Sequence, residues 1–215
     1  MPSANAMGTH TTHAAPRLAP RLVPIDVSAA IPCPALEVSD WVGISTPLTL
    51  DELRGRVIVL EAFQMLCPGC VSHGLPLAAR LAEAFDANTL QVIGLHTVFE
   101  HHDVQGTRAA LEAFMHEYRL PFPVAIDAPG DASVPRSMTR LGLRGTPSLL
   151  VLDQAGRIRA HLFGRVDELQ LGALLGALIA ENAPPSERHA SPLHGTPIAN
   201  ACDESGCPLP GSAPT

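Results

Sequence analysis

The chain has 215 residues, of which 46% are hydrophobic, and a formal net charge of −7. This length and composition suffice for one sizeable buried core, so we expect one domain with terminal segments outside it. An acidic balance without a run of lysine or arginine argues against nucleic acid or an anionic membrane as the partner. No stretch of the sequence reaches the ~20 apolar residues that span a bilayer.

The first 35 residues are rich in proline, alanine, threonine and histidine and have neither a helical nor a strand period. We therefore expect a flexible N-terminal segment over 1–35. A secretory signal needs an apolar run of roughly 7–15 residues, and Arg17, Arg21 and several prolines interrupt the candidate run. This favours a cytoplasmic protein. Cys33, between two prolines, is expected to be an idle thiol or to be bonded to the C-terminal tail.

A reactive dithiol is predicted where a strand meets a helix. The β-branched and aromatic run 57–63 is typical of a buried strand, and 71–85 has apolar residues at helical spacing. Between them stands Cys67-Pro-Gly-Cys70. The first cysteine then lies at a helix N-terminus, where free amide N–H groups and the helix dipole stabilise a thiolate, the nucleophile of disulfide exchange. The second cysteine, one turn away, can attack a mixed disulfide on the first.

Two further positions suit this chemistry. Glu61 lies inside the predicted strand, six residues before Cys67, and burial there would raise its pKa and let it exchange a proton with Cys70. The alternative is an edge-strand glutamate turned to solvent. Pro147 precedes another predicted strand and marks a strand start or a cis turn. We expect a cis Thr146–Pro147 bond packed against the dithiol, with a trans bond as the alternative.

The rest of the chain is predicted to alternate strands and helices. The predicted strands are 90–95, 123–126, 148–152 and 157–163, the last two joined by a turn at 153–156, and the predicted helices are 107–118, 134–141 and 168–181. This order implies an α/β domain over 36–182 with a mixed central sheet and helices on both faces. The remainder, 183–215, is rich in proline, serine, glycine and histidine and is expected to be a flexible tail.

Two cysteines of that tail, Cys202 and Cys207, allow several interpretations. They could form a second redox pair that exchanges with Cys67 and Cys70, since a flexible tail of this length can reach the site. The alternatives are a local disulfide or two idle thiols. A structural zinc site shared with the first pair is a further alternative, but the tail has no hydrophobic framework.

The chain resembles thioredoxin-like proteins. The positions that carry the resemblance are Glu61, Cys67, Cys70, Thr146 and Pro147, together with the turn 153–156. The resemblance implies that the first cysteine attacks, the second resolves the mixed disulfide, and the Thr146-Pro147 loop binds the backbone of the partner.

Within that group the chain is similar to TlpA/ResA-type thiol-disulfide oxidoreductases. The segment 47–55 before the core strand carries this similarity, and the helix–strand pair 107–126 matches an insertion of TlpA-like proteins and peroxiredoxins. Many TlpA-like proteins are exported, so the resemblance also implies a periplasmic location as an alternative. Leu66 replaces the tryptophan usual before the first cysteine, which changes the surface offered to partners.

We therefore expect a thiol-disulfide oxidoreductase that uses Cys67 and Cys70, without a cofactor, to reduce disulfides of proteins or small thiols, and that is itself restored by an unidentified reductant. A thiol peroxidase is an alternative, because peroxiredoxins share the fold. Gln64, however, stands where they carry a threonine, three positions before the reactive cysteine. A metal-binding or copper-delivery module built from the dithiol and His96 or His102 is the non-enzymatic alternative.

Overall fold

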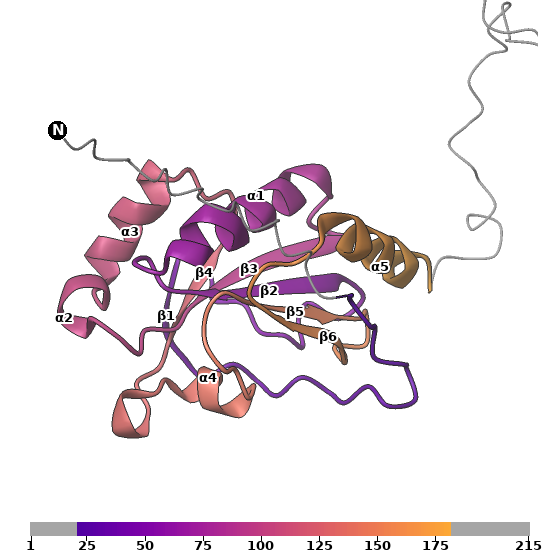
Figure 1. Ribbon diagram of the computed structural model, residues 1–215, viewed down its shortest axis with the longest axis horizontal. Helices are drawn as coiled ribbons and strands as arrows, with labels where there is room; N and C mark the ends of the chain where they lie inside the picture. The colour runs from indigo at the N-terminus through magenta and orange to yellow at the C-terminus, as the bar shows by residue number, and fades with distance from the viewer. Residues whose placement is uncertain (1–20, 182–215) are drawn as a thin grey trace, which may run out of the picture. The chain divides into compact units, whose positions relative to one another are not determined.

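The computed structural model describes residues 21–181. Their six strands form one sheet, in the order β1-β4-β3-β2-β5-β6 (Figure 1). The strands are β1 (Val38–Val42), β2 (Val57–Phe63), β3 (Leu90–His96), β4 (Val124–Asp127), β5 (Ser148–Leu152) and β6 (Ile158–Phe163). The helices are η1 (Cys70–Gly74), α1 (Leu75–Ala84), α2 (His102–Gln105), α3 (Arg108–Glu117), η2 (Asp131–Ser133), α4 (Arg136–Arg140) and α5 (Glu168–Ala180).

The sheet is mixed, as the order of the elements predicts. β2 is parallel to β3, and β3 is parallel to β4. The remaining pairs, β1 with β4, β2 with β5 and β5 with β6, are antiparallel. All seven residues of β2 are buried, because this strand has a neighbour on each edge and a layer of side chains on each face. The dithiol therefore follows directly from the centre of the sheet.

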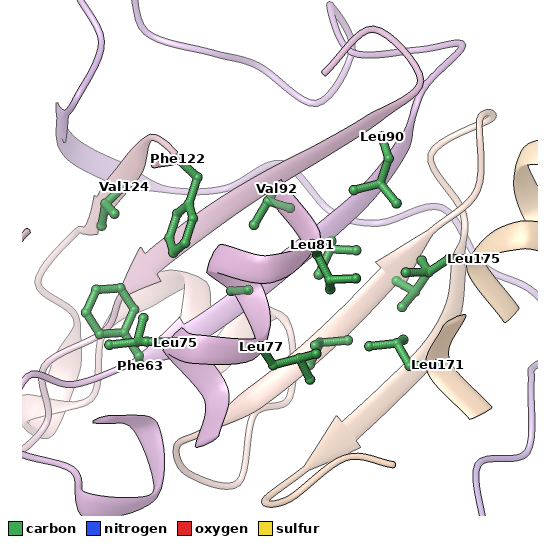
Figure 2. Close-up of a cluster of buried hydrophobic side chains, with 14 of the residues drawn as sticks. Phe63, Leu75, Leu77, Leu81, Leu90, Val92, Phe122, Val124, Leu171 and Leu175 are labelled. Carbon is green, nitrogen blue, oxygen red and sulfur yellow. The ribbon is translucent and has the colours of Figure 1, made fainter. Parts of the chain in front are cut away.

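Helices cover both faces of the sheet: α1, α3 and α5 lie on one face and α4 on the other (Figure 1). Successive side chains of β2 alternate between the two layers. Val57, Val59 and Phe63 join the core beneath α1, α3 and α5, whereas Ile58 and Leu60 join the core beneath α4. Figure 2 shows the first of these cores, with leucines of α1 and α5 packed against side chains of β2 and β3.

The segment around the dithiol differs from the expected helix. The first helical turn is π-helical over Cys70–Gly74, and α1 continues it from Leu75. Such turns widen a helix locally and are frequent at functional sites. Three elements, β1, α2 and η2, have no counterpart among the sequence predictions. None of the helices within residues 21–181 is long and apolar enough to cross a membrane.

The described part of the N-terminal segment lies along β6. The Ile25 N–H donates to the Arg159 carbonyl at 2.7 Å, and the Cys33 N–H donates to the Gly156 carbonyl at 2.9 Å. Leu22 is buried. Residues 21–35, which the composition assigns to a flexible segment, are thus hydrogen-bonded to the edge of the sheet. The domain limits 36–182 stay a prediction.

Candidate redox site

The two cysteines of the motif have different surroundings. The Cys67 thiol is partly exposed and donates to the Thr146 carbonyl at 3.4 Å, and the Cys70 N–H donates to the Cys67 sulfur at 3.3 Å. Cys70 has no exposed surface. Burial raises the pKa of the Cys70 thiol, and Cys67 beside it acts in the same direction. Cys67 is therefore the accessible sulfur and Cys70 the protected one, and both are free thiols in the structure.

Pro147 packs against the helical turn that carries the dithiol, and the Thr146–Pro147 bond is cis. A Cβ placed on Gly69 would lie 3.1 Å from Pro147 Cδ, and one placed on Gly74 would lie 3.0 Å from Pro147 Cβ. The proline ring therefore fills the space that two glycines leave open. This contact brings the Thr146 carbonyl to the accessible sulfur.

Glu61 lies beneath the same turn. It is only 1% exposed, and its Oε1 atom has no hydrogen-bond partner. Burial raises the pKa of the Glu61 carboxyl well above its usual range, and the charge of a Cys67 thiolate raises it further. A buried carboxylic acid that senses the charge on the neighbouring sulfur is suited to hold or accept a proton during exchange.

Gly74 makes the room that Glu61 occupies. Its φ of −61° is helical, so the backbone itself would accept any residue. A Cβ at this position, however, would lie 2.1 Å from Glu61 Oε1 and 3.0 Å from Pro147 Cβ. The glycine is thus required by side-chain packing.

We expect Gly74→Ala to lower the free energy of unfolding by about 1–3 kcal/mol, because the methyl group overpacks a buried site. Gly176→Ala is the matched control: this glycine lies in α5 with nothing within 4 Å of an added Cβ, and alanine should there stabilise the helix by about 0.5–1 kcal/mol. Urea unfolding of both variants measures the difference. Equal effects of the two substitutions would contradict the packing argument.

A pair of buried glutamines connects the segment just before the dithiol with the loop after β3. Gln64 Oε1 accepts hydrogen bonds from the Phe99 N–H at 3.1 Å and the Glu100 N–H at 3.2 Å, and from Gln105 Nε2 at 3.2 Å. Gln105 Oε1 in turn accepts from the Leu66 N–H at 3.0 Å. This network was not predicted from the sequence, although a glutamine between Phe63 and Met65, in an apolar run, indicates a side chain with a buried hydrogen-bond partner.

His96, which ends β3, and His102 do not form a metal site with the dithiol within the described residues. His96 is buried with its ring centroid 5.3 Å from that of Phe63, its Nε2 has no hydrogen-bond partner, and burial lowers its pKa to about 4. With His102 and Asp127 it lines a separate cavity of about 170 Å³. Among residues 21–181, no three histidine, cysteine, aspartate or glutamate side chains gather in a way that could hold a metal ion.

Cys33 lies apart from this site. Cys33 is half-buried against the core beneath α4, and burial raises its pKa to about 11. It is a free thiol in the structure. Cys202 and Cys207 lie outside the described residues, so their role stays a prediction.

Comparisons with known proteins agree on the fold and the family. Residues 30–161 match the AhpC/TSA family. The structure of a thioredoxin-like superfamily protein, SPOA0173, is 55% identical, covers 72% of this chain and 100% of its own, and superposes with a TM-score of 0.69. A thiol-disulfide isomerase from Corynebacterium glutamicum is 48% identical, over 69% of this chain and 97% of its own, with a TM-score of 0.66.

A more distant structure shows the fold alone. The thioredoxin domain of a thiol-disulfide oxidoreductase from Bacteroides vulgatus is 17% identical over 69% of this chain and 96% of its own, with a TM-score of 0.54. No curated protein matches the sequence significantly. The matches of family, sequence and fold agree with one another, and the chain belongs to the AhpC/TSA family of the thioredoxin-like superfamily.

Proposed function

We propose that this protein is a thiol-disulfide oxidoreductase that reduces disulfides of other proteins through Cys67 and Cys70. The observation that supports it most is that the accessible Cys67 stands beside the buried Cys70, whose backbone N–H donates to the Cys67 sulfur. A dithiol so arranged can form a mixed disulfide and then resolve it without leaving the site.

The exchange has two steps. The Cys67 thiolate attacks one sulfur of the substrate disulfide, so that a new S–S bond joins it to the substrate and the other substrate sulfur leaves as a thiolate. Cys70 then loses its proton, with Glu61 as the acceptor, and attacks Cys67. The substrate leaves as a dithiol, reduced by two electrons. The Cys67–Cys70 disulfide that remains is reduced back to the dithiol by an external thiol reductant.

A thiol peroxidase is the second candidate, because the AhpC/TSA family match supports it. Against it, the side chain of Gln64 is committed to the loop after β3 and not to the sulfur of Cys67. A peroxidase needs donors that bind the peroxide beside its thiolate. Here the polar neighbours of the Cys67 sulfur are the Thr146 carbonyl, which is an acceptor, and the Cys70 N–H, which already donates to the sulfur itself.

The test is to mix the fully reduced protein with a disulfide-bridged peptide or with hydrogen peroxide and to follow oxidation of the dithiol. We expect the peptide to oxidise it in a fast second-order reaction and to be released as a dithiol, while peroxide reacts no faster than with a free thiol. A reversed order of the two rates would replace the proposal with the peroxidase. The location in the cell stays a prediction from the sequence.

A further inference from the structure

A polar groove runs from the dithiol turn toward the start of α5. It has a volume of about 290 Å³ and is lined on one side by His73, Gly74 and Arg80, and on the other by Gly164 and Arg165. The groove begins at the turn itself, because Gly74 contacts Pro147 and the Gly164 N–H donates to the Pro147 carbonyl at 2.9 Å. We call it the arginine groove.

Its floor is an unsatisfied buried group. Glu61 lines the groove, is 1% exposed, and its Oε1 atom has no hydrogen-bond partner. Burial raises the pKa of this carboxyl well above its usual range, because it disfavours the charged form.

One of the two arginines that line the groove, Arg165, has no counter-ion within residues 21–181. Arg165 is exposed and makes no ion pair or hydrogen bond with any of residues 21–181. The neighbouring acids are already committed: Glu168 pairs with Arg80 at 2.6 Å, and the Asp167 carboxylate accepts from the Gln170 N–H at 2.9 Å. Arg165 is thus an arginine at this rim of the groove whose guanidinium forms no ion pair among the described residues.

A second such cation lies across the Thr146 edge. The Arg144 guanidinium stands over the ring of Phe163, 5.4 Å from its centroid, and has no ion pair within the described part of the chain. Phe163 is 48% exposed and packs on Gly145, where an added Cβ would lie 3.0 Å from the ring. Arg144 and Arg165 are thus both connected to the cis-proline loop, Arg144 through Phe163 and Gly145, and Arg165 through the neighbouring Gly164.

The backbone between the two arginines is open to an extended peptide. The Thr146 N–H donates to no other described residue, and its carbonyl receives only the weak Cys67 thiol donor. A peptide paired with this edge points successive side chains in opposite directions. Acidic residues near its cystine would then lie close to Arg144 and to the arginine groove.

We propose that the arginine groove and Arg144 bind carboxylate side chains next to the reacting cystine, so that the natural substrates are protein segments with acidic residues beside the disulfide. This rests on the proposed oxidoreductase function and names its substrate class. Guanidinium groups suit the purpose because they bind carboxylates in a planar, two-pronged geometry.

The test uses the reduced full-length protein and three disulfide peptides that differ only in the residues flanking the cystine: glutamate, glutamine or lysine. At low salt we expect the glutamate peptide to react fastest and the lysine peptide slowest. Arg165→Gln and Arg144→Gln should each slow the glutamate peptide about fivefold, the scale of one exposed ion pair, and leave the glutamine peptide unchanged. The preference should disappear near 1 M salt, where the Debye length is about 3 Å.

Arg119→Gln is the control, since this exposed arginine precedes β4, at the end of the parallel strands away from the dithiol. It should leave all three rates unchanged. Equal rates for the three wild-type reactions would overturn the substrate class while leaving the oxidoreductase intact. An equal loss with every peptide in Arg165→Gln, together with a shifted pH–rate profile, would instead assign the groove to proton movement at Glu61. If no peptide is reduced, the oxidoreductase proposal itself fails.

Discussion

Cys67→Ser is expected to abolish disulfide reduction down to the rate seen without protein, whereas Cys70→Ser is expected to accumulate a stable mixed disulfide with the substrate. Cys67 is the accessible sulfur and Cys70 has no exposed surface. Serine at position 67 removes the accessible sulfur of the dithiol. Serine at position 70 removes only the group that resolves the mixed disulfide, so the first step still occurs.

The same difference should appear in alkylation of the reduced wild-type protein. We expect Cys67 to be labelled faster than Cys70 by a wide margin, because Cys70 is enclosed and burial raises the pKa of its thiol. Cys33→Ser is the matched control and should leave turnover unchanged, since Cys33 packs against the core on the face beneath α4. Faster labelling of Cys70, or a trapped complex in Cys67→Ser, would reverse the assigned roles.

The centre of this fold could be predicted from the sequence because its signals are local. The β-branched run of β2, the helical spacing after Cys70 and the turn between β5 and β6 each specify one element without reference to the rest of the chain. The place of Glu61 was also a local inference, since a carboxylate inside a run of apolar strand residues has few places to point.

Other features depend on contacts between distant segments and had no such signal. β1 is five residues long and has a mixed burial pattern that does not alternate cleanly, so its existence rests on pairing with β4. α2 has only four residues and is anchored by Gln105, which reaches back to Leu66. Residues 21–35 have no period, and it is the open edge of β6 that orders their described part.

The arginine groove belongs to this second class. Arg165 lies 98 positions from Cys67, in a segment whose sequence indicates only a loop. Arg144 precedes a glycine, which by itself indicates only a turn. Their relation to the dithiol appears only once the hydrogen bond from Gly164 to Pro147 joins the end of β6 to the cis-proline loop. The order of charges along the sequence does not show that these distant residues lie close together in the fold.

Glu61→Gln is expected to slow exchange near neutral pH and at the same time to stabilise the fold. The amide keeps the size of the carboxyl but can neither accept nor return the Cys70 proton, so we expect the resolving step to fall by about a hundredfold, the lower end of what a positioned acid or base contributes. The stability gain follows because the amide does not ionise, whereas the wild-type carboxyl lies in a buried site that disfavours its charged form.

The pH dependence separates these two effects of Glu61. The folded protein disfavours the ionised carboxylate, so its pKa is raised above the value of 4.5 that applies to an exposed glutamate. The folded state therefore binds the Glu61 proton more tightly than the unfolded state does. The stability that this proton adds is present in full below pH 4.5 and is lost as the pH rises toward the folded pKa. The stability gain of Glu61→Gln over wild type should therefore grow with pH above that point, as measured by urea unfolding across the range. A gain that is flat with pH would place Glu61 in contact with water, and a pH–rate profile identical to wild type would remove it from the proton transfer.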